Sequence, residues 1–516
     1  MKSLIGSLLV GVAVSLASTL ASAQGAASVR TPGVAPEVAS SSDPREQARA
    51  MAERAAAWLR TQQHPSGGWS IPPDGTKNGP VYPAISGLAL AGLVNQPGAT
   101  AKDDAVRRAV GFIVKYQQSD GGIYDKVMPG YNTSICAAAL AKVDSPEAKD
   151  ATKRAVEFLK QIQYGEAALP GAGGGEAAVV VGPEHPFYGG WGYGNRGRPD
   201  VSNTHFALEA LHEAGVPESD PAFKRAVAFL QRMQMIETTP DGTKVNDQAY
   251  AKGSKQGGFI YATAVNKDSV GQGQSFAGEI VESQSGPPGC EATFAIDKSV
   301  KNGMTREDAG KRLDAAAKGE AGLAAGYMVV LGASGDGKSS REITVRAPIT
   351  DTEKFRAVVA GVFADVLGEK PTISVRRIEA WQGVSRLRAY GTVSYAGFKS
   401  YLYASLSKND PRVLAVKDWV SRNYTLDENP GMGTDGLYYY FNVFAPALEA
   451  NGEEMLRVIA ADGTASQRNW RADLVANLTT LQDAEGSCRS VADRWLEDNK
   501  VLITAYALRA LQHAAR

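Results

Sequence analysis

Apolar and polar positions along this chain define two kinds of helical segment that follow one another. In the first kind, apolar residues recur at helical spacing on one face and charged residues occupy the other, which predicts an amphipathic helix with one buried side. The second kind is nearly uncharged all round, which predicts a helix enclosed by other helices. We therefore expect outer helices to alternate with inner helices, and the inner ones are predicted at 82–93, 132–143, 202–214, 395–406, 437–450 and 502–513.

A short phrase recurs between these helices. Each outer helix carries Arg-Ala, an aromatic-apolar pair and a glutamine, and two glycines with an aromatic residue follow, as in Gln163 and then Gly189-Gly190-Trp191. The glycines permit a tight reversal, the aromatic side chain fills the gap between neighbouring hairpins, and the glutamine can bond exposed backbone. Six copies predict six helical hairpins that can close on themselves. They begin at Arg54, Arg108, Arg154 and Arg225, with weaker copies at Trp419 and Leu478.

This phrase resembles the QW repeat of squalene-hopene cyclases and the repeats of protein prenyltransferase β subunits, which form the terpenoid cyclase/prenyltransferase α/α-toroid superfamily. The resemblance covers about residues 48–266 and 387–515. It implies an all-α fold, an (α/α)6 toroid of six helical hairpins with QW-like repeats. The repeat is specific for the fold, whereas it specifies no activity.

Residues 267–386 interrupt the fourth repeat. A polar stretch at 268–289 is followed by a region in which strand and helix periods alternate in the order β-α-β-β-α-β, which indicates a small α+β ferredoxin-like insert. The predicted domains are therefore toroid repeats at 45–266 and 387–516, with the insert and its linker at 267–386. The elements of the insert are expected at 291–297, 306–318, 327–331, 342–346, 351–367 and 372–378.

The insert contains one phosphate-loop pattern, GASGDGKS, at residues 332–339. A phosphate loop needs a helix after its lysine, because the amides and the dipole of that helix meet the phosphate. Here the residues at 341–345 have the pattern of a strand. We therefore interpret the motif as a turn between two strands and predict no nucleotide site.

The amino terminus indicates export. Residues 1–23 contain an early lysine, an apolar run and a final Ala-Ser-Ala, which is typical of a signal peptide, and residues 24–44 form a leader rich in Ala, Ser and Pro. We predict a periplasmic or secreted protein without a transmembrane anchor in the mature chain. The 55 basic and 55 acidic residues are balanced, so nothing argues for a nucleic-acid partner, and three cysteines make no disulfide framework.

The resemblance places the acid of a class II cyclase at the start of an inner helix, in a D-x-D-D-T motif whose central aspartic acid protonates an alkene. The matching residues run from Asp200 to Thr204, and they hold Ser202 at the proton-donor position with Asn203 beside it. A hydroxyl group is not acidic enough for this step. Asp200, Ser202 and Asn203 are thus a degenerate acid motif, and Asp200 is expected to cap the helix.

The protein prenyltransferase resemblance implies a zinc ion held by an Asp-x-Cys pair on inner helices, and the predicted inner helices contain none. A different polar face occurs on the third inner helix, where His205, Glu209 and His212 are spaced at i, i+4 and i+7. Its functional interpretations are a divalent-metal site or an acid/base group. We favour the alternative that neighbouring hairpins satisfy these side chains, and no cofactor is predicted.

If the family layout holds, the amino ends of the inner helices share one pole, where their free amides favour an anion. Basic and aromatic residues precede these ends and could hold an anionic head group over an aromatic well. The predicted ligand or anion site consists of Tyr188, Trp191, Tyr193, Arg196, Arg198 and Tyr438.

Three functions remain open from the sequence. The leading one is a terpenoid-cyclase-like protein without the cyclase acid that binds an apolar or isoprenoid-like ligand in its cavity; any enzyme activity would be cyclase- or isomerase-like. The second is a carbohydrate-active enzyme that acts on acidic glycans. The third is an interaction scaffold that binds a protein partner through the insert.

Overall fold

The computed structural model describes residues 43–71, 80–166, 180–194, 197–263, 272–282, 288–297, 299–300, 304, 306–319, 328–331, 342–378, 384–460, 463–490 and 492–516. This part of the chain is largely helical, with small sheets. The predicted signal peptide, most of the leader, Arg196 and the motif at 332–339 lie outside it. Within the described ranges, every helix is too short or too polar to span a bilayer.

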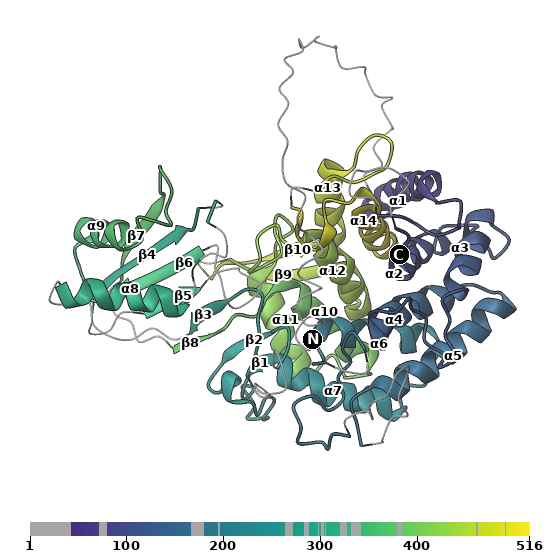
Figure 1. The fold of residues 1–516 in the computed structure, drawn as a ribbon, viewed down its shortest axis with the longest axis horizontal. Helices are drawn as coiled ribbons and strands as arrows, with labels where there is room; N and C mark the ends of the chain where they lie inside the picture. Colours follow the sequence, from purple (N-terminus) through teal and green to yellow (C-terminus); the bar gives the residue numbers. More distant parts are fainter. Residues whose placement is uncertain are drawn as a thin grey trace, which may run out of the picture. The chain divides into compact units, whose positions relative to one another are not determined.

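Six inner helices form a closed cycle of neighbours (Figure 1). Each packs against the next one along the chain, and the last packs against the first. Nearly all of their residues are buried, because other helices surround them. They are α2 (Pro83–Val94), α4 (Pro129–Leu140), α6 (Val201–Glu213), α10 (Gly391–Tyr403), α12 (Leu437–Asn451) and α14 (Lys500–Ala514).

Six outer helices alternate with them along the chain. Each begins after an Asp, Ser or Asn whose side chain accepts a backbone N–H of the first turn, and four of them have proline in that turn. Both features favour a helix start, because they satisfy or remove a donor that has no partner within the helix. The outer helices are α1 (Pro44–Gln62), α3 (Asp104–Val114), α5 (Pro146–Ile162), α7 (Pro221–Met233), α11 (Pro411–Asn423) and α13 (Trp470–Leu481).

The glutamine of the repeated phrase links neighbouring hairpins. Gln163 Nε2 lies 2.9 Å from the carbonyl oxygens of Gly189, in its own turn, and Ala222, in the next outer helix. Gln482 bonds the carbonyl of Met51 at 3.0 Å and so joins the last repeat to the first. The same pair of bonds is made by Gln63, Gln117 and Gln234.

The two glycines allow each turn to rest directly on the next outer helix. Gly189 has a φ of +87°, and a Cβ atom there would lie 1.8 Å from the carbonyl oxygen of Arg225. A Cβ atom at Gly190 would lie 2.8 Å from the ring of Phe229. Only glycine permits this left-handed conformation and this approach together.

The fifth repeat departs from the pattern. Tyr424 follows α11 in place of a glutamine, and its hydroxyl donates to Asp473 at 2.8 Å. Between α12 and α13 the chain forms an antiparallel hairpin of β9 (Met455–Ile459) and β10 (Ala465–Asn469), which the sequence pattern does not predict.

The segment inside the fourth repeat contains the six elements expected from the sequence. Its antiparallel sheet has the strand order β5-β6-β4-β7, and α8 and α9 pack against the sheet around a separate apolar core (Figure 1). The residues after the phosphate-loop pattern form the strand β6, which pairs with β5. A strand at this position agrees with the interpretation of the motif as a turn between two strands. The elements are β4 (Gly289–Ala295), α8 (Arg306–Gly319), β5 (Met328–Leu331), β6 (Glu342–Ala347), α9 (Thr352–Val362) and β7 (Ile373–Ile378).

Two further strand pairs flank this segment and were not predicted. One joins β1 (Gln234–Ile236) to β2 (Lys255–Phe259), and the other joins β3 (Glu279–Glu282) to β8 (Val384–Leu387). The second pair brings the two ends of the inserted segment side by side, so the chain leaves the fourth repeat and returns to it at the same place.

Candidate functional site

The degenerate acid motif lies at the amino end of α6. Asp200 is the N-cap, and its carboxylate accepts hydrogen bonds from Asn203 N at 2.8 Å and from Asn203 Nδ2 at 2.7 Å. Asp200 is 1% exposed, and this burial raises the pKa of its carboxyl to about 6, although the bonds from Asn203 oppose the rise. Ser202 is half-buried beside Tyr439. Asp200 therefore has the capping geometry expected of it.

Thr204 has a structural partner that explains its presence in the motif. Its Oγ1 accepts a hydrogen bond from Trp191 N at 3.1 Å. The same bond, from the residue after the glycine pair to a hydroxyl on the inner helix, recurs in four other repeats. It is made there by Ser86, Thr133, Ser394 and Thr504. The threonine is thus a feature of the repeat, and it carries no information about an acid motif.

Aromatic side chains fill the ring axis near the amino ends of the inner helices. We call Tyr131, Tyr193, Phe206, Tyr439 and Tyr506 the aromatic mouth. Phe206 stacks on Tyr439 with ring centroids 5.7 Å apart and meets Tyr131 edge-on at the same distance. Tyr439 and Tyr506 are also 5.7 Å apart, and Tyr131 and Tyr193 are 6.0 Å apart. Of this set, sequence reasoning placed Tyr193 and Tyr131 near the predicted anion site and did not single out Phe206, Tyr439 or Tyr506.

Exposed apolar side chains occur in the loops that precede three of the inner helices. Tyr82, Val127, Trp495 and Leu496, which we call the apolar rim, precede α2, α4 and α14 and are 41%, 57%, 42% and 48% exposed. The ring of Trp495 packs on Phe276. Four of the five non-glycine residues with left-handed backbone in the described chain lie in the same two loops. They are Lys126, Met128, Trp495 and Leu496.

Left-handed backbone of this kind is conformationally strained and concentrates at functional sites. The strained loops and the exposed apolar side chains coincide here, next to the aromatic mouth. This coincidence marks the amino end of the ring as a candidate binding surface.

Of the residues predicted for a ligand or anion site, Tyr193 and Arg198 lie together against Tyr261, whereas the other described ones have separate partners. Trp191 is 1% exposed and donates its Nε1 proton to Leu159 O, so it acts as a staple between helices. Tyr438 is 1% exposed and donates to the carbonyl of Arg489. Tyr188 packs in a small separate cluster with Phe187. Arg198 lies 5.1 Å above the ring of Tyr261 and donates to Gln274.

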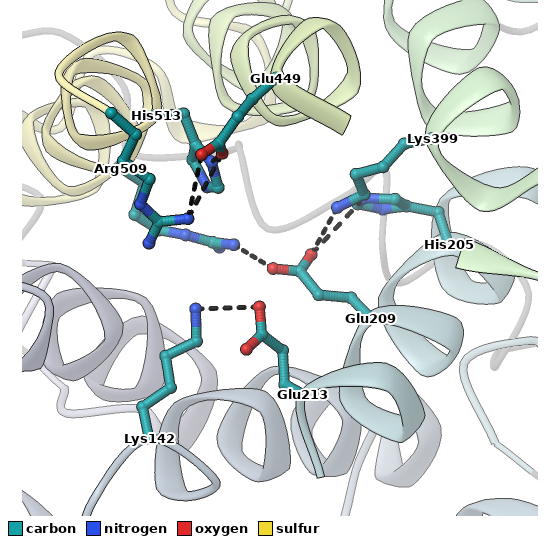
Figure 2. A network of polar contacts seen from close by, with 9 residues as sticks. Lys142, His205, Glu209, Glu213, Lys399, Glu449, Arg509 and His513 are labelled. Atoms are coloured by element: carbon teal, nitrogen blue, oxygen red, sulfur yellow. Dashed lines mark hydrogen bonds and ion pairs between the residues drawn. The ribbon is translucent and has the colours of Figure 1, made fainter. Parts of the chain in front are cut away.

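A network of charges occupies the axis near the carboxyl ends of the inner helices. Figure 2 shows its side chains converging from α6, α10, α12 and α14, together with Lys142, which lies just beyond the end of α4. Glu209 of α6 is at its centre: Lys399 Nζ of α10 donates to it at 2.9 Å, and Arg509 of α14 donates to its other oxygen. Lys142 and Glu213 are paired at 3.0 Å, and His513 contacts Glu449. Glu209, Lys399 and Arg509 are 4%, 1% and 6% exposed.

The pairing fixes the charge states in this network. Burial opposes ionisation of Glu209, but the charges of Arg509 and Lys399 hold the pKa of its carboxyl well below the usual range. Burial and the charge of Lys399 hold the pKa of His205 well below its usual value, so this imidazole is neutral. Its Nε2 lies 3.6 Å from Glu209 Oε2, and neither ring nitrogen has a hydrogen-bond partner.

The arrangement disfavours the metal interpretation of the third inner helix. The described residues contain no group of three or more His, Cys, Asp or Glu side chains placed to hold a metal ion. His205 and Glu209 adjoin each other, but Glu209 is occupied by two cations, which would repel a metal. His212 is exposed instead and stacks on Tyr403 at 4.0 Å.

A cavity borders the network, between Phe206, Glu209 and Arg509. Its volume is about 10 Å³, which is roughly the space of one water molecule. This cavity is therefore far smaller than the space that a lipid-sized ligand needs.

Comparison with known protein families agrees with the repeats. Residues 79–253, which run from before α2 to beyond α7, match the model of the squalene-hopene cyclase C-terminal domain. This match confirms the predicted resemblance to the terpenoid cyclase/prenyltransferase toroid superfamily. No functionally curated protein matches the sequence.

Solved structures with some likeness include the type II terpene cyclase MstE from Scytonema, without ligand, at 11% identity and a TM-score of 0.27 over 91% of this chain and 99% of that one. The same cyclase, solved as a variant with geranylgeranyl dihydroxybenzoate, has 11% identity and a TM-score of 0.27 over 92% and 98%. A protein from Actinoplanes has 13% identity and a TM-score of 0.30 over 91% and 100%. At these values the likenesses carry none of the argument that follows.

Proposed function

We propose that this chain, which is similar over residues 79–253 to the squalene-hopene cyclase C-terminal domain, binds an apolar, isoprenoid-like ligand without cyclising it. In this proposal the closed cycle of inner helices is an (α/α)6 toroid and the inserted segment is a ferredoxin-like module. The ligand lies on the aromatic mouth and the apolar rim. Export of the protein remains a prediction from its first 23 residues.

One observation supports this location above all others. The aromatic mouth and the charge network fill the axis, and the cavity between them is about 10 Å³. An isoprenoid chain cannot enter this space, whereas the apolar rim offers side chains that are about half exposed. Covering such side chains is favourable at about 25 cal/mol per Å² of apolar surface.

The chemistry at the mouth favours binding without reaction. Protonation of an alkene needs a strong acid, and Ser202 supplies none. Asp200 has the one carboxyl group in the motif, but its pKa of about 6 makes it a weaker acid than an ordinary carboxylic acid. Both of its carboxylate oxygens also accept hydrogen bonds from Asn203. We therefore expect an intact ligand to be bound and released.

The glycan-active alternative has less support. It requires accessible carboxylates at the rim, and Asp435, just before α12, is 4% exposed and paired with Arg494 at 3.0 Å. Within the described residues of the inserted segment, no contact favours the scaffold alternative over ligand binding.

Titration with geranylgeraniol, followed by tryptophan fluorescence and by calorimetry, tests the proposal. Leu496→Ser should weaken binding about tenfold, because a half-exposed leucine contributes about 1.4 kcal/mol when a ligand covers it. Leu414→Ser is the matched control, since Leu414 is equally exposed, at 48%, but lies on the outer helix α11. Equal affinities of the two variants, or no binding by the wild type, would refute the proposal.

Product analysis tests the absence of cyclisation. The wild type incubated with geranylgeraniol or squalene should return only the starting compound. Ser202→Asp should give the same result, because a second carboxyl beside Asp200 would be held by like-charge repulsion at a still higher pKa. Any cyclised product from the wild type would show that an acid other than Ser202 operates.

A further inference from the structure

The departure of the fifth repeat from the common pattern creates a cleft on the outer side of the ring. Where other repeats place a glutamine bridge and a short turn, this one has Tyr424 and the β9–β10 hairpin. The cleft has a volume of about 280 Å³ and lies between α10, α11, α12 and β9. This volume is at the lower end of the range for small-molecule sites and suits about one or two amino-acid residues.

The floor of the cleft is apolar apart from one amide. Phe398, Val420, Leu448 and Leu456 are at most 6% exposed. Asn451 ends α12 at the same depth, with an exposed fraction of 0%, and its Oδ1 has no hydrogen-bond donor among the described residues. A buried acceptor without a partner costs about 1 to 3 kcal/mol, so a ligand N–H donor at this atom would be stabilising.

In the described structure, the charged side chains in the walls of the cleft are paired with one another or with a neighbour, except for one cation, Arg457. Lys417 Nζ is paired with Glu453 at 2.7 Å, and Asp418 is paired with Arg422 at 2.8 Å. Arg457 of β9 lines the same cleft, is exposed, and forms no ion pair within the described part of the chain. A guanidinium group in this position favours a carboxylate, which it can bind through two parallel hydrogen bonds.

We propose that this cleft binds the carboxy-terminal apolar residue of a peptide. The apolar side chain lies on the floor, the peptide N–H donates to Asn451 Oδ1, and the terminal carboxylate pairs with Arg457. An apolar group, an N–H donor and an anion are the features that the carboxy-terminal end of a peptide presents together. The site is separate from the aromatic mouth and is independent of the function proposed there.

Calorimetric titration with N-acetyl-alanyl-leucine, as the free acid and as the carboxamide, tests this assignment. The acid should bind the wild type about tenfold more tightly than the amide, because only the acid pairs with Arg457. Arg457→Gln should remove this difference and leave binding of the amide unchanged. Arg107→Gln, which removes an exposed charge on α3, should leave both affinities as they are.

Asn451→Leu should weaken the acid and the amide by the same factor, because both present the N–H donor. Leu496→Ser on the apolar rim should leave both unchanged, which separates this site from the mouth. Equal binding of acid and amide by the wild type would overturn the assignment. So would an Arg457→Gln variant that keeps the preference, or no binding of either peptide at millimolar concentration. Arg457 is exposed, so its variant is expected to fold.

Discussion

The inner helices present aromatic side chains to the ring axis near their amino ends and ionisable side chains near their carboxyl ends. Phe206 and Glu209 show the contrast within one turn of α6: the first stacks on Tyr439, and the second is bonded by Lys399 and Arg509. Both ends are closely filled, but they respond differently to change. Removing an aromatic ring leaves an apolar cavity, whereas removing a buried ion leaves the charges of its partners uncompensated.

The largest expected effect is at the ionic end. Glu209→Leu should lower the free energy of unfolding by about 3 to 5 kcal/mol, because Lys399 and Arg509 remain buried without a counter-charge. Chemical denaturation measures this loss. Combining Glu209→Leu with Lys399→Met and Arg509→Met should restore most of the stability, since apolar side chains then replace the whole network. A triple variant no more stable than Glu209→Leu would contradict this account of the network.

The two ends should also differ in the sign of their pH dependence. Asp200 at the aromatic end has a folded-state pKa of about 6, above its ordinary 3.8, so the folded state binds the proton first. Its contribution is fully present below pH 3.8 and is lost as the pH rises through 6, by up to about 3 kcal/mol. Asp200→Asn should remove this slope in unfolding experiments between pH 4 and 6.

His513 at the ionic end should give the opposite slope. Burial lowers the pKa of its imidazole from 6.5 to about 4, although Glu449 opposes the shift, so the unfolded state binds the proton first. Stability from this group is present above pH 6.5 and is lost as the pH falls toward 4, again by up to about 3 kcal/mol. His513→Gln should remove this loss of stability at low pH. The comparison would be contradicted if Asp200→Asn and His513→Gln changed the pH dependence of stability in the same direction.

The smallest effect is expected at the edge of the ionic end. Lys142 and Glu213 form a single pair whose side chains are 14% and 23% exposed, so water solvates either residue when the other is removed. Lys142→Gln should change the free energy of unfolding by no more than about 1 kcal/mol. A loss as large as that of Glu209→Leu would mean that this pair belongs to the buried network.

The repeated phrase predicts the hairpins because its residues act within short stretches of chain. The glycines allow the turn, the glutamine links neighbouring hairpins, and side-chain caps start the helices. Boundaries are less accurate, and α10 begins at Gly391 rather than at 395 because Tyr390, in extended conformation, precedes it as the N-cap. The capping role of Asp200 is likewise local and could be predicted.

The rest of the candidate site depends on partners far apart in sequence. Glu209 is bonded by residues 190 and 300 positions away, so its helical spacing with His205 and His212 could not reveal that cations occupy it. The aromatic mouth likewise gathers one ring from each of four inner helices and the ring of Tyr193 from the loop before α6. One signal was available: Lys399 and Arg509 are charged residues within otherwise uncharged inner helices, which indicates a buried counter-charge.

The bond from Gln482 to Met51 has a consequence for how the gene could be rearranged. Its geometry is that of every other link in the series, and Arg45 Nε also meets the carbonyl of Arg516 at 3.0 Å. The junction between the last hairpin and the first is therefore equivalent to a junction inside the chain. A circular permutant in which Arg516 is joined to Arg45, with new termini in the turn between β9 and β10, should fold to the same ring.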